Sequence, residues 1–284
     1  MTVGEEEPEE LDVTDDERVR AEEFAYQIRR RVLEQSMRAN VGHIGSALSI
    51  ADIVATVYSR FLAAQPPDHD DRDRFILSKG HAALAVYSAL HLLGRISSDE
   101  LNSYCADGSR AGVHPERQLA GIDFSTGSLG HGLSIGAGAA LAGKMLGSQR
   151  RTFVLLSDAE CNEGSIWEAA MFAGHHRLSG LIAIVDMNGQ QALGYTRDVL
   201  HVASMADRWR TFGWATYEVN GHDTDQMAAA VREAARVTDA PSVVLANTVF
   251  GKGVSFMEAR IMWHYMPMSD EEFARALAEI GAPR

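Results

Sequence analysis

The second half of the chain alternates between short apolar runs and segments with helical spacing, and this alternation most limits the fold. The apolar runs are predicted strands, and the segments between them are predicted helices. The predicted strands cover residues 152–156, 181–185, 215–219 and 242–249, and the predicted helices cover 165–178, 202–212 and 224–237. Such alternation requires a mostly parallel sheet with helices on both faces. We therefore predict an α/β fold.

The first half adds helices and one more strand. Helices are predicted over 17–36, 49–62, 82–94 and 130–147, with a strand over 74–77 and a last helix over 270–280. The helix over 130–147 is rich in glycine and alanine, which predicts burial and close backbone approach. Residues 105–129 lack periodicity, and a loop of this length in a compact domain is usually functional. Without a repeat or a linker, we predict one domain over 17–284, preceded by an acidic disordered tail over 1–16.

Charge and composition exclude several classes of protein. The formal net charge is −13, with nine acidic residues within the first 17 positions. A nucleic-acid-binding protein needs clustered basic residues to neutralise phosphates, so we expect no nucleic-acid partner. Two cysteines are too few for a disulfide scaffold, and no apolar run is long enough to span a bilayer. We expect a cytoplasmic protein with no membrane association.

Two polar residues follow neighbouring predicted strands at the point where each strand ends. Asp158 follows the strand 152–156, and Asn188 follows the strand 181–185. Parallel strands open their carboxyl ends on the same edge of a sheet, where ligands bind. Carboxylate and amide oxygens suit Mg²⁺, which also retains waters and phosphate oxygens. The alternative is an ordinary turn or helix cap, which is the more frequent role of an aspartate at the end of a strand.

The surrounding motifs resemble those of the transketolase family. The segment Ser157–Ser165, followed thirty residues after Asp158 by Asn188, is similar to the thiamine-diphosphate signature, which begins Gly-Asp-Gly and ends at an Asn. Five further segments resemble transketolase motifs in transketolase order: Asn40–Gly45, Leu77–Ala82, Gly112–Glu116, Thr126–Gly130 and Gly251–Glu258. The resemblance runs from about residue 20 to the end. It implies the thiamine-diphosphate-binding fold, and in particular its diphosphate-binding domain.

The resemblance also implies roles for individual residues. The metal ligands for Mg²⁺ would be Asp158, Asn188 and the carbonyl of Gln190. The residues that contact thiamine diphosphate would be His81, Gly127, Ser128, Leu129, Ser157, Asp158, Ala159 and Asn188. The catalytic residues would be His43, His114, His264 and Glu163. The histidines would face the substrate and Glu163 would meet its counterpart across a subunit interface, while Tyr265 is the alternative to His264 because the local alignment can slip by one residue.

Several histidines suit this cofactor, because imidazole is the side chain that exchanges protons most readily near neutral pH. The sequence departs from the family at Ser157-Asp158-Ala159, which replaces Gly-Asp-Gly, and at Gly189–Leu193 and Tyr265–Pro267. A side chain at 157 or 159 could crowd the diphosphate or only demand an ordinary backbone conformation.

Full-length transketolases continue into a second domain that completes the site. The resemblance therefore implies the N-terminal subunit of a split transketolase, acting on a small sugar with a separate C-terminal subunit, in an α2β2 assembly. Such an enzyme moves a two-carbon ketol unit from a ketose to an aldehyde. The alternatives are a thiamine-diphosphate-dependent enzyme that decarboxylates 2-oxoacids or forms acyloins, and a non-catalytic binding subunit of the same fold.

Overall fold

A five-stranded parallel sheet forms the centre of the protein. The computed structural model describes residues 15–62, 69–201 and 204–281. The predicted acidic tail lies outside these residues, apart from Asp15 and Asp16, which begin the first helix. The strands are β1 (Arg74–Leu77), β2 (Thr152–Ser157), β3 (Leu181–Met187), β6 (Ala215–Asn220) and β7 (Ser242–Asn247), in the spatial order β1-β2-β3-β7-β6. The predicted α/β fold with a parallel sheet is confirmed.

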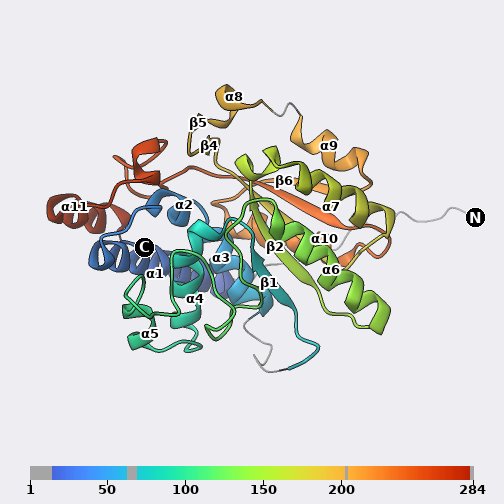
Figure 1. Cartoon of the computed structure of the whole chain (residues 1–284), viewed down its shortest axis with the longest axis horizontal. Helices are drawn as coiled ribbons and strands as arrows, with labels where there is room; N and C mark the ends of the chain where they lie inside the picture. The colour runs from blue at the N-terminus through green and yellow to red at the C-terminus, as the bar shows by residue number, and fades with distance from the viewer. Residues whose placement is uncertain (1–14, 63–68, 202–203, 282–284) are drawn as a thin grey trace, which may run out of the picture.

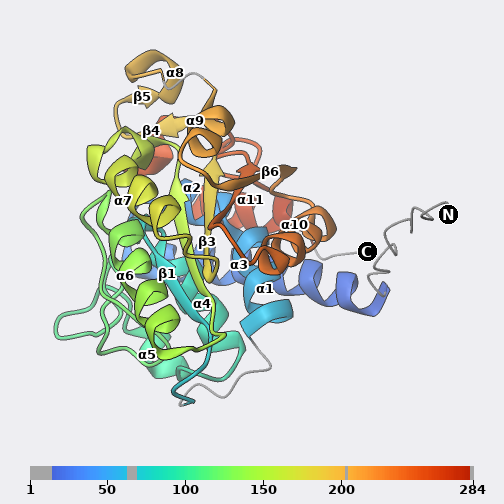
Figure 2. The same cartoon turned by 90° about the vertical axis from the view of Figure 1, so that its right-hand side faces the viewer.

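Helices cover both faces of this sheet (Figures 1 and 2). One face carries α6 (His131–Leu146), α7 (Gly164–His175) and α9 (Met205–Thr211). The other carries α1 (Asp15–Ala39), α3 (Ala51–Val57), α4 (Ala83–Leu92) and α10 (Thr224–Arg236), with α11 (Asp270–Ile280) against α1. Figure 2 shows α6 and α7 on one side of the strands and α1, α3 and α10 on the other.

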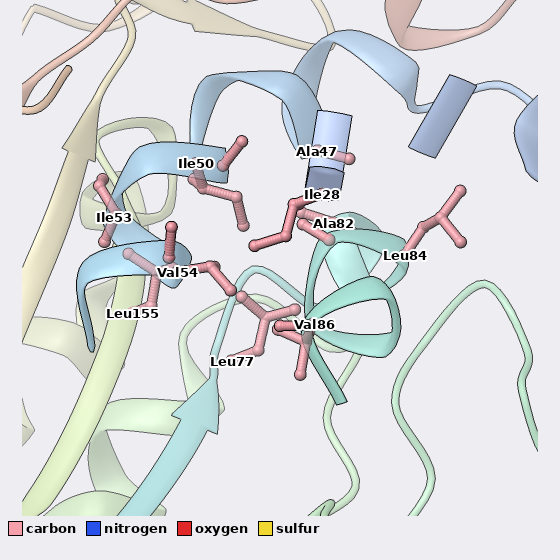
Figure 3. Close-up of a cluster of buried hydrophobic side chains, with 14 of the residues drawn as sticks. Ile28, Ala47, Ile50, Ile53, Val54, Leu77, Ala82, Leu84, Val86 and Leu155 are labelled. Atoms are coloured by element: carbon pink, nitrogen blue, oxygen red, sulfur yellow. The ribbon is translucent and has the colours of Figure 1, made fainter. Parts of the chain in front are cut away.

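The alternation of side chains along each strand divides the interior into two cores. In β2, Val154 and Leu156 belong to the core under α6 and α7, whereas Phe153 and Leu155 belong to the core under α1, α3 and α4. All four side chains are fully buried, and each contributes about 1.5–3 kcal/mol through burial. Figure 3 shows Leu155 within the second core. Burial on both faces explains why these strands read as continuous apolar runs.

The predicted helix over 49–62 is present over 51–62 and is preceded by a separate short helix. Helix α2 (Ile44–Ser49) ends before Ile50, where the helical conformation is interrupted. Helix α3 follows and continues into a π-helical turn, η1 (Tyr58–Leu62). At the break the Ser49 hydroxyl donates a hydrogen bond of 2.8 Å to Asp186 of β3. The sequence did not predict α2 or the interruption at Ile50.

Helix α6 is only partly buried, in contrast to the prediction. Its inner face approaches the sheet closely, since a Cβ at Gly136 would overlap the Val154 side chain. Its outer face is open, with Met145 79% and Leu146 74% exposed. No helix in the described part of the chain is long and apolar enough to cross a membrane.

Short elements cluster near the carboxyl ends of the strands and in the connecting loops. They are η2 (Gly80–Ala82), α5 (Ser98–Asn102), η3 (Ala159–Asn162), the hairpin β4 (Gln190–Gln191) and β5 (Gly194–Tyr195), α8 (Thr196–Val199) and η4 (Ile261–His264). The hairpin and α8 stand together at the top of Figure 1, beyond the end of β3. Periodicity did not predict them, because each is too short to show a period.

Candidate active site

The ends of β2 and β3 bring Asp158 and Asn188 together, as predicted from strand order. The two strands are adjacent and parallel, with Ser157 paired to Asp186. The Asp158 N–H donates to the Asp186 carbonyl at 3.1 Å, and the Gly189 N–H donates to Asp158 Oδ2 at 2.9 Å. The two turns therefore form one hydrogen-bonded unit at the carboxyl edge of the sheet.

The turn Ser157-Asp158-Ala159 needs no glycine. Asp158 has φ −60° and ψ −39°, and neither Ser157 nor Ala159 has a positive φ. Side chains at these positions therefore introduce no backbone strain. The ordinary backbone conformation expected for a turn without glycine is found.

Several side-chain oxygens gather in this unit. Asn188 donates from Nδ2 to Asp186 at 2.8 Å, and its Oδ1 accepts from the Gln190 N–H at 2.9 Å. Burial, followed by the nearby charge of Asp186, raises the pKa of Asp158 to about 6. A buried carboxylate with this environment would be stabilised by a cation. Gln190 lies beside Asn188, and its side-chain Oε1 is buried with no hydrogen-bond partner among the described residues.

Three histidines from distant parts of the chain form a cluster. The ring centroids are 5.5 Å apart for His43 and His81, 5.2 Å for His43 and His264, and 5.3 Å for His81 and His264. Tyr265 packs edge-on against His264 with ring centroids 5.4 Å apart, is 57% exposed, and donates a hydrogen bond to the Ala192 carbonyl. Of the two candidates near the C-terminal end, His264 is the one whose ring contacts both His43 and His81.

The backbone at His43 is held in an unusual conformation. Its φ of 62° lies in the left-handed region, and its N–H donates to the His264 carbonyl at 3.2 Å. A Cβ at the preceding Gly42 would overlap the Tyr265 backbone. Backbone strain of this kind costs about 1–3 kcal/mol and is typical of functional sites.

The clustered imidazoles are held in the neutral form. Burial, then the charge of Lys79, lowers the pKa of His81 well below its usual value. Burial, then His43, lowers the pKa of His264 to about 4, and burial, then His114, lowers the pKa of His43. The Nδ1 atoms of His43 and His264 are buried with no partner in the described structure. Each is therefore a polar atom whose hydrogen-bonding capacity is unused in the described structure.

The predicted cofactor contacts Gly127, Ser128 and Leu129 form a segment that lies next to Gly80 and His114. A Cβ at Gly80 would lie 3.1 Å from the Gly127 Cα, and a Cβ at Gly127 would lie 3.2 Å from the His114 ring. The segment Gly127–Leu129 therefore packs beside the histidines, with Ser128 and Leu129 exposed. Glu163 lies apart from the histidines, exposed at the start of α7.

Sequence reasoning missed the buried ion pair beneath the site. Lys79 Nζ lies 2.5 Å from Asp186 Oδ2, and both side chains are 0% exposed. Asp186 also accepts hydrogen bonds from Ser49, Asn188 and Thr248. The sequence did indicate a buried charge here, since Asp186 is a charged residue at the end of an otherwise apolar strand.

The pair connects the two halves of the site. Lys79 Nζ also donates to the Ser46 carbonyl at 3.4 Å, and the Ser46 hydroxyl lies 2.8 Å from His81 Nε2. A continuous network thus runs from the Asn188 amide to the histidine cluster. Fold and site together define an α/β domain that presents an oxygen-rich turn and neutral imidazoles at the carboxyl edge of a parallel sheet.

Comparison with known proteins places this domain in a family. The family model described as "Transketolase, thiamine diphosphate binding domain" matches residues 20–283. The chain belongs to the transketolase family. This match, together with the relatives below, confirms that the chain is part of a thiamine-diphosphate-dependent, transketolase-type enzyme, and it favours this prediction over the 2-oxoacid alternative.

Similar relatives include proteins named as separate subunits of a transketolase. The chain is 41% identical over 256 residues to a subunit of the 6-deoxy-6-sulfo-D-fructose transketolase of Clostridium sp. (strain MSTE9), covering 89% of this chain and 93% of that one. It is 38% identical over 254 residues to a subunit of the apulose-4-phosphate transketolase of Phocaeicola vulgatus, covering 89% and 90%.

Solved transketolases share the fold. The structure matches transketolase from Campylobacter jejuni with a TM-score of 0.87 and 27% identity, over 95% of this chain and 45% of that one. It matches transketolase from Leishmania mexicana with a TM-score of 0.86 and 29% identity, over 92% and 41%. The chain thus spans less than half the length of these solved transketolases.

Proposed function

We propose that this chain binds the diphosphate end of thiamine diphosphate and transfers a two-carbon ketol unit from a ketose to an aldehyde, together with a second polypeptide. The observation that carries the proposal is the joining of the Asp158–Asn188 turn to the cluster of His43, His81 and His264. A diphosphate held at the turn would leave the imidazoles available to the rest of the cofactor and the substrate. Neither half of the site would suffice alone.

Asp158, Asn188 and the carbonyl of Gln190 would hold Mg²⁺, with the diphosphate supplying further oxygens. The residues fit the ion, because Asp158 is a buried carboxylate with a raised pKa whose hydrogen bonds in the described structure come from uncharged donors. His81 would contact the diphosphate, as would the turn at Ser157 and Ala159. Gly127, Ser128 and Leu129 would line the cofactor beyond it. Bound thiamine diphosphate supplies an electron sink that accepts the ketol unit.

The remaining histidines would orient and deprotonate the substrate. His43 and His264 are neutral and carry Nδ1 atoms with no partner in the described structure, so either imidazole would serve as a hydrogen-bond acceptor toward a sugar hydroxyl that reaches it. His114 lies at the exposed side of the cluster, against Gly127, where it would meet the incoming sugar. Proton transfer by a positioned side chain contributes about 10²–10⁴ to the rate.

A separate C-terminal subunit would complete the site. The relatives named as subunits are nearly as long as this chain, and the solved transketolases are more than twice as long. We propose an α2β2 assembly in the cytoplasm, in which Glu163 meets its counterpart across the interface between two copies of this chain. The exposed position of Glu163 at the start of α7 supports this arrangement.

The substrate class follows from the same relatives. One is named for a sulfonated ketose and one for a phosphorylated ketose. We propose that the donor here is also a ketose that carries a terminal anionic group. Co-purification with a candidate second subunit, followed by assays with ketose donors and with 2-oxoacids, tests the assignment.

Ketol transfer that depends on thiamine diphosphate is the expected result. The Asp158→Ala variant should abolish it, whereas Asp239→Ala, an exposed aspartate before β7 at the opposite edge of the sheet, should not. Turnover of 2-oxoacids alone, or full activity of Asp158→Ala, would overturn the proposal.

A further inference from the structure

A second acidic residue of the cofactor motif, Glu160, is completely buried behind the site. Its side chain is 0% exposed, two residues after Asp158 in the turn η3. Oε1 accepts hydrogen bonds from the Ser78 hydroxyl at 2.5 Å and from the Gly130 N–H at 2.7 Å. Oε2 accepts from the Ser157 N–H at 3.4 Å. Burying a carboxylate costs free energy unless hydrogen bonds compensate, and three donors directed at one side chain supply that compensation.

The departure from glycine at Ser157 is part of this arrangement. The Glu160 N–H donates to Ser157 Oγ at 3.1 Å, while the Glu160 carboxylate accepts from the Ser157 N–H. This reciprocal pairing of a serine with a glutamate three residues later is the geometry of a capping box. Glycine at 157 would lack the hydroxyl that accepts one of the two bonds.

The three donors come from separate parts of the chain, and each adjoins a proposed cofactor contact. Ser78 lies three residues before His81, Gly130 directly follows Leu129, and Ser157 directly precedes Asp158. Glu160 therefore links all three segments through hydrogen bonds of a single side chain.

The region around the Glu160 carboxylate is closely packed and has little room for rearrangement. A Cβ at Gly132 would overlap the Ser78 side chain, and a Cβ at Gly130, whose φ is 89°, would overlap the Ser165 hydroxyl. Ser165 in turn donates to the Gly130 carbonyl at 3.0 Å. Because neighbouring backbone and side chains are in contact, a shift of the Glu160 carboxylate would be transmitted to the segments around it.

We propose that Glu160 is a positioning residue, which holds the Asp158 turn and the Gly127–Leu129 segment at the separation that thiamine diphosphate requires. The inference rests on the proposed function and assigns a role that neither the metal ligands nor the histidines fulfil. A carboxylate only accepts hydrogen bonds, and all three groups around it donate. A glutamine would present its NH₂ group to at least one of these donors, with almost no change in size.

Glu160→Gln is the test, made in the assembled complex with thiamine diphosphate and Mg²⁺. Loss of supporting hydrogen bonds around a metal site typically costs about 10–100-fold in affinity, and we expect the cofactor Kd to rise by that factor. Saturating cofactor should recover most of the lost turnover, which a general loss of folded protein would not allow. Ser157→Gly, which keeps the carboxylate, should raise the Kd less than Glu160→Gln does.

A matched control is Glu233→Gln on the exposed face of α10, which should bind the cofactor as the wild type does. Hydrogen exchange gives a local readout: the Gly130 amide should lose protection in Glu160→Gln, and amides of β7 should keep theirs. If Glu160→Gln does not fold, Ser78→Ala removes one donor while leaving the carboxylate, and should raise the Kd by a smaller factor.

An unchanged cofactor Kd in a folded Glu160→Gln complex would overturn the positioning role, as would an unchanged Kd in Ser78→Ala where the glutamine variant does not fold. A wild-type complex that binds no thiamine diphosphate would instead refute the proposed function. The two failures are therefore distinguishable.

Discussion

Replacing Lys79 by methionine should destabilise the protein strongly, because it removes the cation from a fully buried ion pair. Lys79 and Asp186 are both 0% exposed and 2.5 Å apart. The methionine side chain approximates the aliphatic part of lysine, so the packing volume changes little. What remains is a buried carboxylate that is hydrogen-bonded to Ser49, Asn188 and Thr248 but no longer paired with a positive charge.

Removing one partner of such a pair costs about 3–5 kcal/mol. This is a large part of a typical stability of about 5–15 kcal/mol. Urea unfolding followed by tryptophan fluorescence measures the loss. The control is Arg236→Met on α10, whose ion pair with Glu233 has side chains 58% and 52% exposed, and which should lose at most about 1 kcal/mol.

The double variant Lys79→Met, Asp186→Leu separates stability from function. Replacing both members with apolar side chains removes the unpaired charge but leaves Ser49, Asn188 and Thr248 without their acceptor, so it should recover only part of the lost stability. It should not recover cofactor binding, because Asn188 Nδ2 then has no carboxylate to orient it. A loss in unfolding free energy below about 1 kcal/mol for Lys79→Met alone would refute the inference that Lys79 and Asp186 form a water-free ion pair beneath the site.

Three further outcomes are expected. His264→Ala should lower kcat of the assembled enzyme by about 10²–10⁴, while Tyr265→Phe changes it little, and equal losses in steady-state assays would contradict the placement of His264. The pKa of His264 is lowered to about 4 in the folded protein, so the unfolded chain binds a proton at higher pH than the folded chain does. The free energy of unfolding should therefore fall as the pH drops from about 6.5 towards 4. A pH profile of stability in His264→Gln as steep as in the wild type would count against this. Removing Mg²⁺ with a chelator should weaken thiamine diphosphate binding, and titration calorimetry showing the same affinity with and without the ion would exclude the proposed ligand set.

Most of the sheet could be predicted from sequence because four of its strands are largely buried on both faces. Continuous apolar runs predicted β1 with its correct bounds and β2, β3 and β7 within a few residues, and the partly exposed edge strand β6 was also predicted to within one residue. The convergence of Asp158 and Asn188 followed from the same pattern, since adjacent parallel strands end at one edge. A residue's position relative to the end of a predicted strand therefore indicates, from the sequence alone, which edge of the sheet it occupies.

Contacts between distant segments could not be predicted in this way. Lys79 and Asp186 are 107 residues apart, and nothing in either local pattern indicates the other. The choice between His264 and Tyr265 depends on the turn η4, where a shift of one residue exchanges the inward and outward side chains. The S-x-x-E pattern at Ser157 and Glu160 was visible in the sequence, but the donors from Ser78 and Gly130 required the folded chain.

The most direct test of the proposed metal site at the Asp158–Asn188 turn is a crystal structure of the assembled complex grown with thiamine diphosphate and Mn²⁺ in place of Mg²⁺. We expect an anomalous peak about 2.1–2.3 Å from Asp158 and Asn188 side-chain oxygens, with the diphosphate completing the coordination. A bound cofactor whose metal lies away from both residues would contradict the account.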